Sequence, residues 1–133
     1  MEAHEGGCIC GELRYRLTGT PAGSMVCHCH TCRRLSAAPV MAWLSCSEDQ
    51  FAFVRGTPAT FSTSPPVTRW FCARCGTHVA YIRADDPGSV EVSACSLDDP
   101  AAFPPTHHSW LEHSVDWVRF GDGLPVFQRS RYG

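Results

Sequence analysis

Three clusters of cysteine carry the chemistry available to this chain of 133 residues. Their members follow C-x-C, C-x-C-x-x-C and C-x-x-C spacing and are Cys8 and Cys10; Cys27, Cys29 and Cys32; Cys72 and Cys75. Thiolates are preferred ligands of zinc, and a closed structural zinc site takes four of them. The three thiols that remain predict a second site with a vacant position, which is how catalytic zinc sites are built.

Disulfide bonds are the alternative use of these cysteines. The total of nine cysteines is odd, and the two members of a C-x-C pair rarely bond because the ring would be strained. Residues 1–7 are acidic and polar, which is untypical of a signal peptide, so we expect a cytoplasmic protein with reduced thiols. Clustered cysteines in that compartment favour a metal over disulfides.

The composition restricts the classes of function. The chain is 44% hydrophobic and 18% charged, as expected for one globular domain over residues 1–133. All eleven basic residues are arginine, which excludes lysine Schiff bases and P-loop lysines. The net charge is −2 and the arginines are scattered, so the sequence has no basic stripe of the kind that binds nucleic acid. No apolar run approaches the ~18 residues of a membrane helix, so we expect neither nucleic acid nor membrane as partner.

Short strand patterns follow one another along the chain. Leu13, Tyr15 and Leu17 alternate with charged residues, as in a half-buried strand. Comparable runs, mostly separated by glycine or proline, occupy residues 40–44, 51–54, 59–63, 68–71, 79–82, 90–93 and 117–120. Single helical turns are predicted at 32–37 and at 47–50, where Ser47 could cap. The patterns predict an all-β, mainly antiparallel fold with very short helical turns.

The cysteine clusters stand within longer motifs that occur in a fixed order. These are Gly7-Cys8-Ile9-Cys10-Gly11, residues 27–33, residues 71–77, Ser96-Leu97-Asp98-Asp99-Pro100, His108, Trp117 and residues 122–125. Together they resemble the family of glutathione-dependent formaldehyde-activating enzymes, which also contains the centromere protein V domain. The resemblance runs over about residues 6–127, and we take this span as the core of a single domain.

The resemblance implies a fold, two metal sites and a reaction. The fold is a β-tent of antiparallel strands that binds two zinc ions per chain. The implied ligands are Cys8, Cys10, Cys72 and Cys75 for a structural zinc, and Cys27, Cys29 and Cys32 for a second, catalytic zinc. The implied activity is that of a carbon–sulfur lyase, the reversible formation of S-hydroxymethylglutathione. The expected partners are therefore a small thiol such as glutathione and an aldehyde.

The sequence leaves four candidates for the fourth ligand of the second zinc. Cys46 is close in sequence to the second cluster, and Cys95 stands where the family usually has a small residue. The family often has Ser-Gly after this cluster, whereas this chain has Ser36-Ala37. Water, Cys46, Cys95 or a histidine could complete the site. A closed site would favour a non-catalytic zinc module for protein interaction or for thiol or metal sensing, and an open site favours an enzyme.

Several polar side chains are candidates for roles beside the second zinc. His28, inside the cluster, and His108, at a family position, could move a proton to the oxygen of the adduct. Structural support and solvation are the alternatives for His28. Arg33 and Arg69 could hold the carboxylates of glutathione, because a guanidinium matches the carboxylate fork, although each could instead be surface charge. We expect His78 to have a packing role.

Overall fold

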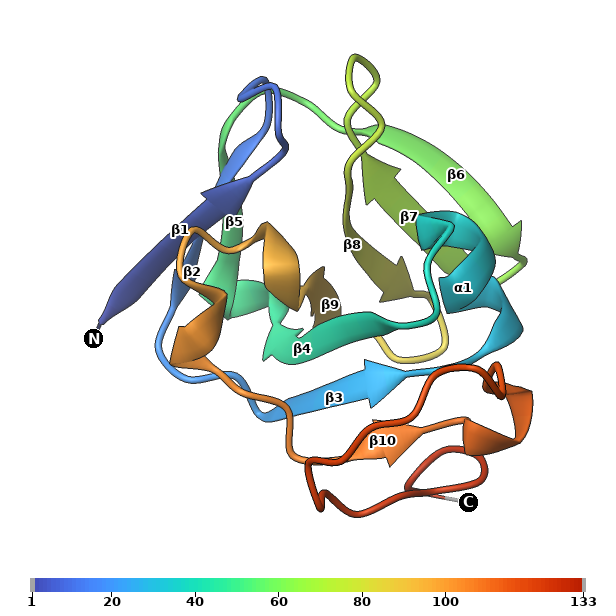
Figure 1. Ribbon diagram of the computed structural model, residues 1–133. Coiled ribbons are helices and arrows are strands. Elements are labelled where there is room, and N and C mark those ends of the chain that lie inside the picture. The colour runs from blue at the N-terminus through green and yellow to red at the C-terminus, as the bar shows by residue number, and fades with distance from the viewer. Residues whose placement is uncertain (1, 133) are drawn as a thin grey trace.

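The computed structural model describes residues 2–132 and consists mainly of β-strands arranged in two sheets (Figure 1). The strands are β1 (Ala3–Gly7), β2 (Arg14–Thr18), β3 (Gly23–Cys27), β4 (Met41–Ser47), β5 (Phe51–Arg55), β6 (Ala59–Ser64), β7 (Val67–Phe71), β8 (His78–Arg83), β9 (Ser89–Ser93) and β10 (His108–Ser109). The helices are α1 (His30–Ser36) and the 3-10 turns η1 (Glu48–Gln50), η2 (Ala94–Ser96), η3 (Pro100–Ala102) and η4 (Leu111–His113). None of these helices is long and apolar enough to cross a membrane.

Antiparallel pairing dominates both sheets. The smaller sheet has the order β1-β2-β5, and the larger has the order β10-β3-β4-β9-β8-β7-β6. Only the short pair β10–β3 is parallel among the strands of residues 2–132. Most of the pairs join strands that are consecutive in the chain, which short turns permit. The prediction of a mainly antiparallel all-β fold with very short helices is confirmed.

Seven of the predicted strands correspond to β2 and β4 to β9. The prediction of a strand at 117–120 is wrong, because this segment pairs with no strand and leaves Trp117 73% and Phe120 45% exposed. Three observed strands, β1, β3 and β10, were not predicted. They are rich in glycine, serine and histidine, residues that give no alternating apolar signal.

The main core lies where the two sheets face each other. Leu17, Leu44, Val79 and Val92 are fully buried there, and Tyr15 places its ring among them. The Tyr15 hydroxyl is 2.7 Å from the Ser96 hydroxyl oxygen, so its polar end is satisfied inside the core. Large side chains from both sheets therefore share one core.

Helix α1 begins at the second cysteine cluster and ends at an unusual residue. The Cys32 N–H donates to the Cys29 sulfur over 3.3 Å, so Cys29 acts as the N-cap of the helix. Ala37 closes the helix in the left-handed region, with φ of 50°. This conformation costs a residue with a Cβ about 1 kcal/mol relative to glycine, which explains why the family often has glycine here.

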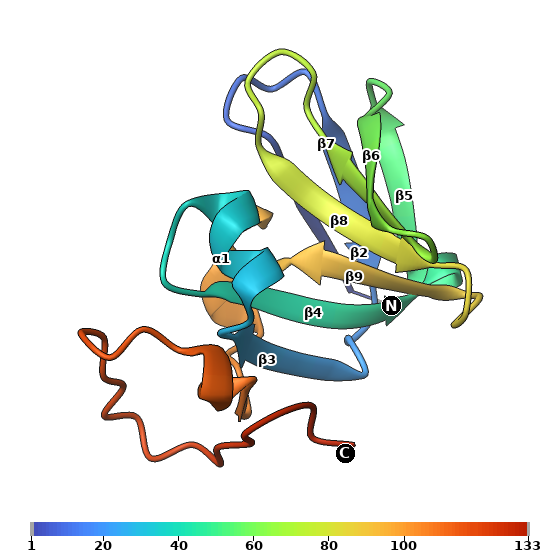
Figure 2. The same cartoon turned by 90° about the vertical axis from the view of Figure 1, so that its right-hand side faces the viewer.

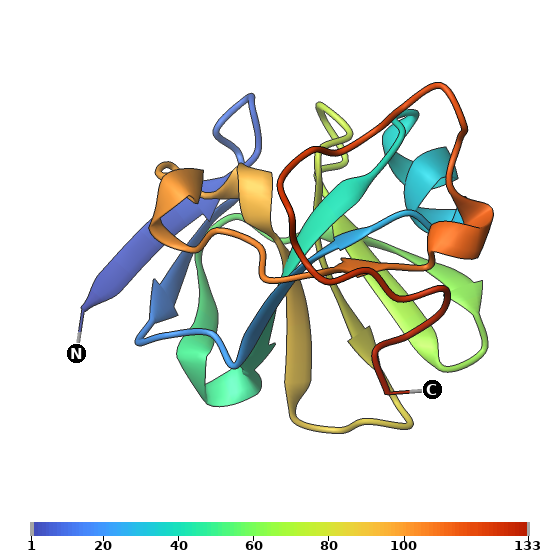
Figure 3. The same cartoon turned by 60° about the horizontal axis from the view of Figure 1, so that its bottom comes forward.

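The carboxyl-terminal segment after β10 lies along the edge of the larger sheet, away from the three-stranded sheet (Figures 2 and 3). Backbone hydrogen bonds hold it there: the Phe127 N–H donates to the His108 carbonyl and the Trp110 N–H to the Arg129 carbonyl. This attachment brings η4 beside the second cysteine cluster, because β10 pairs with β3, the strand that ends at Cys27.

Candidate metal centres and their pockets

The first and third cysteine clusters form one group of four sulfurs. The ligand atoms of Cys8, Cys10, Cys72 and Cys75 all lie within 4.8 Å of one another. The Cys10 sulfur is 3.6 Å from the sulfurs of both Cys8 and Cys72. Zn–S bonds of 2.3 Å in a tetrahedron place the sulfurs about 3.8 Å apart, so the residues present fit a structural zinc ion.

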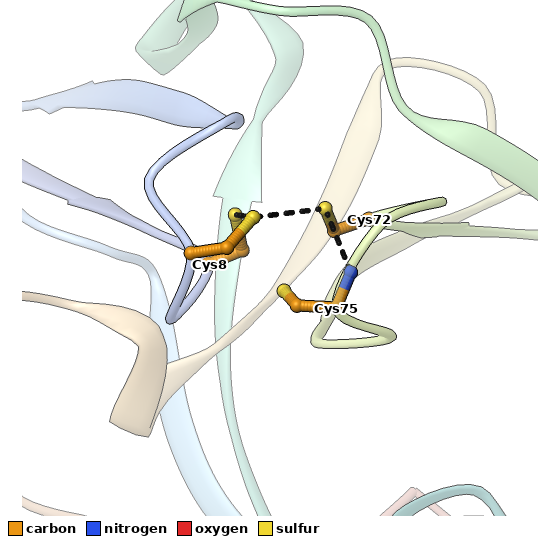
Figure 4. Close-up of side chains that lie close together, drawn as sticks. Cys8, Cys72 and Cys75 are labelled. Atoms are coloured by element: carbon orange, nitrogen blue, oxygen red, sulfur yellow. Dashed lines mark hydrogen bonds between the residues drawn. The ribbon is translucent and has the colours of Figure 1, made fainter.

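Two tight loops turn these sulfurs towards one another (Figure 4). The Leu13 N–H donates to the Cys8 sulfur over 3.2 Å in the β1–β2 loop, and the Cys75 N–H donates to the Cys72 sulfur over 3.4 Å in the β7–β8 loop. Gly76 has φ of +82°, which a glycine adopts without strain. The four-cysteine group therefore connects the small sheet to the large one.

The second cluster forms a separate group of three sulfurs within 4.8 Å of one another. Cys27 ends β3, Cys29 precedes α1 and Cys32 lies in the first turn of α1. The indole N–H of the fully buried Trp43 donates to the Cys32 sulfur over 3.4 Å. Hydrogen bonds from Cys27 and then Cys32 lower the pKa of Cys29 to about 2, so the group stabilises a thiolate. Three sulfurs are soft donors that suit a zinc ion, which binds them as thiolates.

The two remaining cysteines lie away from this group. Cys46 is 4% exposed within the main core, and its sulfur lies 3.9 Å from the Leu44 carbonyl oxygen. Cys95 is exposed and lines a hollow beside Cys8, at the other cysteine group. Neither sulfur belongs to a metal-type group among residues 2–132. These two possible ways of closing the second site do not occur in this structure.

A pocket of about 360 Å³ lies against the three cysteines, and we call it the thiol pocket. Its walls come from β3, α1, β6 to β8 and the segment at η4: Met25, Cys27, Cys29, His30, Thr31, Cys32, Thr63, Ser64, Val67, Arg69, Tyr81, Arg83, Trp110 and His113. The rings of His30 and His113 stack at 3.9 Å, and Trp110 stacks on His113 at 5.0 Å. Trp110 has φ of 63°, a conformation that is rare for residues with a bulky side chain.

The arginines of the thiol pocket differ in their partners. Arg83 is bonded to both carboxylate oxygens of Asp85 at 2.9 Å. Arg69 is 7% exposed, and its Nε donates to the Thr63 hydroxyl over 3.1 Å. Within residues 2–132 no carboxylate pairs with Arg69, which leaves it as the uncompensated cation of the pocket. Arg33, the other predicted carboxylate ligand, lines a different hollow beside Trp117.

His28 and His108 lie together, but the structure places them away from the thiol pocket. The His28 Nε2 is 2.9 Å from the His108 Nδ1, and the His108 Nε2 is 2.8 Å from an Asp122 carboxylate oxygen. Both histidines are at most 3% exposed, and burial, followed by His108, lowers the pKa of His28. They line a second cavity of about 580 Å³ under the carboxyl-terminal segment.

Sequence reasoning did not single out Tyr81, Arg83 or His113 as pocket residues. Tyr81 and Arg83 lie in β8, whose predicted role was only to form a strand, and His113 follows the unpredicted strand β10. The only available signal was their residue type, because the pocket forms from segments that lie far apart in the chain.

The structure thus defines a class of small antiparallel β protein with two cysteine groups that can hold metal ions, one of them beside a pocket. The family model described as "Glutathione-dependent formaldehyde-activating enzyme" matches residues 3–113, and the chain belongs to this family.

A curated relative and a solved structure are similar to this chain. A protein of Halomonas elongata named "Putative glutathione-dependent formaldehyde-activating enzyme" is 28% identical over 123 residues, covering 86% of this chain and 78% of the relative. A crystal structure of a Rhodobacter sphaeroides protein shares the fold, with a TM-score of 0.59 at 19% identity, over 92% of this chain and 98% of that one.

The two cysteine groups lead us to expect unequal metal affinities. Four sulfurs would enclose a metal ion, whereas three would leave one side of it open to the thiol pocket that they line. A mild chelator should remove one equivalent of zinc while the circular dichroism spectrum stays unchanged. Simultaneous loss of both equivalents with cooperative unfolding would contradict the division into two kinds of site.

Proposed function

We propose that the protein is a zinc-dependent carbon–sulfur lyase or synthase that acts on the adduct of a small thiol and an aldehyde, with glutathione and formaldehyde as the pair. The observation that carries this proposal is the thiol pocket, because all three cysteines of the second cluster line it and no fourth protein ligand joins their group among residues 2–132. In the forward direction a C–S bond forms between the thiol sulfur and the carbonyl carbon, and the thiol proton ends on the new hydroxyl oxygen.

The family membership and the donor sets support two zinc ions with different roles. Cys8, Cys10, Cys72 and Cys75 would hold the structural ion, and the second cluster would hold the other ion at the thiol pocket. Zinc bound by three thiolates can keep a fourth thiol deprotonated and can polarise an aldehyde oxygen. The Trp43 N–H bond to Cys32 supports this role, because such contacts orient ligands and tune their basicity.

The other walls of the thiol pocket suit an elongated ligand with charged ends. Trp110 and the stacked pair His30–His113 provide a flat aromatic side of the pocket, which would shield a bound ligand from water. Arg69, buried and without a carboxylate partner among the described residues, is the candidate for one carboxylate of glutathione. Because Arg33 lines another hollow, we assign no ligand contact to it.

His28 and His108 support the proposed site indirectly. Their rings bond to each other, the His108 ring bonds also to Asp122, and neither histidine lines the thiol pocket. The His28 N–H of the backbone also donates to the Ser109 carbonyl over 3.0 Å. We therefore assign to both histidines the positioning of the Cys27–Cys29 loop, in place of the predicted proton transfer.

Glutathione should bind to the zinc-loaded protein far more tightly than S-methylglutathione. The methylated sulfur cannot become a thiolate, while every other group of the two ligands is the same. Affinity for glutathione should also rise as the pH approaches about 8, since its thiol must lose a proton on binding. Calorimetric titration of both ligands at several pH values measures this difference.

Equal affinity of the two ligands would show that the sulfur does not enter the cysteine site. If neither ligand binds to the zinc-loaded protein, the lyase proposal is wrong and the non-catalytic zinc module becomes the better interpretation.

A further inference from the structure

Arg69 also lines a second, smaller cavity, to which the function proposed above assigns no role. It measures about 250 Å³ and lies between α1 and the strands β6 to β8. Its walls combine four apolar or small residues with two polar ones: Leu35, Phe61, Phe71, Gly76, Arg69 and His78. The strand registers explain the arrangement, because Phe61 pairs with Arg69 and Phe71 pairs with His78.

Arg69 brings an uncompensated positive charge to this cavity. Its side chain is more than nine-tenths buried, and its Nη1 is buried without a hydrogen-bond partner among residues 2–132. Its Nε donates to the Thr63 hydroxyl, and its guanidinium carbon lies 4.2 Å from the centre of the Tyr81 ring. Buried charges in proteins are normally paired, because an isolated one costs several kcal/mol in lost hydration. An anion from outside the chain would satisfy this need.

His78 adds two more unsatisfied polar atoms. Its Nδ1 and Nε2 are both buried and have no hydrogen-bond partner within the described residues. Burial, and then the charge of Arg69, lower the pKa of His78 to about 4, so the ring is neutral at pH 7. A neutral imidazole still has one N–H to donate, and it adds no second charge beside the guanidinium.

The rest of the cavity is apolar and partly open. Leu35 and Phe71 form two of its walls, and Phe61 on the outer side is 61% exposed. An exposed aromatic side chain of an edge strand can change rotamer without disturbing the core. The volume suits a compact body of about one aromatic ring and is small beside the pockets of drug-sized ligands.

We propose that this cavity is a binding site for a carboxylate with a small apolar body, held by Arg69 and His78 and packed against Phe61 and Phe71. The guanidinium donates to the carboxylate, the imidazole N–H supplies a further hydrogen bond, and the apolar body fills the space under α1. The carboxylate can belong to a separate small acid or to the thiol ligand, because Arg69 lines both this cavity and the thiol pocket.

Benzoate and benzamide test the site on the zinc-loaded protein, since they differ only in the charge and donor pattern of the head group. We expect benzoate to bind about tenfold or more tightly in calorimetry, in line with the strength of hydrogen bonds to charged groups. In nitrogen-15 spectra of the wild-type protein, benzoate should shift the ring nitrogens of His78. Unchanged His78 signals at saturating benzoate would overturn the proposal without any variant being needed.

Two matched variants test which arginine is responsible for benzoate binding. Arg69→Gln should abolish benzoate binding, whereas Arg83→Gln should leave it unchanged, because Arg83 does not line the cavity and is already paired with Asp85. Wild-type affinity in Arg69→Gln would refute the site. Benzoate has no thiol, so its binding is independent of the proposed lyase function.

A competition experiment with glutathione identifies the source of the carboxylate once benzoate binding is established. A loss of benzoate affinity in saturating glutathione assigns the cavity to the carboxylate of the thiol ligand. Unchanged affinity assigns it to a separate small acid.

Discussion

Cys72→Ala should unfold the protein or lower its melting temperature steeply, whereas Cys29→Ala should leave it folded. Structural zinc contributes on the order of 10 kcal/mol in small metal domains, which is comparable to the whole stability of a typical domain. Cys72 belongs to the group that connects the two sheets, while Cys29 lies in the group beside the pocket. Loss of Cys29 should chiefly abolish metal binding at the second site.

Thermal unfolding and zinc content, measured on the same preparations, distinguish the two variants. Cys95→Ala is the matched control, because Cys95 is exposed and belongs to neither group, and it should behave as the wild type. Similar melting temperatures for Cys72→Ala and Cys29→Ala would contradict the assignment of the four-cysteine group as the structural one.

The sequence predicted those parts of the fold whose signals are local. Strands such as β2 alternate charged and apolar residues because one face packs on the core and the other meets water, and this pattern can be read directly. The cysteine spacings are equally local, since each tight loop presents two or three sulfurs by itself. The division into four plus three thiols therefore followed from counting, and the pairing of the first and third clusters followed from the family resemblance.

The parts that were missed depend on contacts between distant segments. Strand β3 reads Gly-Ser-Met-Val-Cys, and it forms because β4 and β10 pair with its two edges. The apolar residues at 117–120 predicted a strand, but Val118 and Phe120 line the cavity beside His28 and His108 instead of entering a sheet. Likewise His113 reaches the thiol pocket only through the pairing of β10 with β3, which no local pattern indicates.

The position of His28 between Cys27 and Cys29 is a better guide to its role than its residue type. Side chains of neighbouring residues in an extended segment point in opposite directions, so a histidine between Cys27 and Cys29 turns away from the sulfurs. The structure places it against His108, which bonds in turn to the exposed Asp122 carboxylate. Residue type alone had favoured proton transfer, while position in the loop favours support.

His108→Ala should destabilise the protein by about 3 kcal/mol and loosen the carboxyl-terminal segment. The substitution removes a ring that is 2% exposed, leaves a cavity beside Phe120, and deprives the buried His28 of its partner. Urea unfolding gives the loss of stability, and amide exchange at Phe127, whose N–H donates to the His108 carbonyl, reports the local loosening.

Asp122→Asn provides the milder comparison for this variant. The amide oxygen can still accept from the Leu124 N–H, and His108 and His28 remain paired, so the loss of stability should be clearly smaller.

Both variants should keep the metal of the four-cysteine group, because His28, His108 and Asp122 do not belong to that group. His108→Ala should weaken metal binding at the three-cysteine group about tenfold or more. Unchanged affinity at that group in a folded His108→Ala protein would show that the two histidines stabilise the carboxyl-terminal segment without positioning the metal loop.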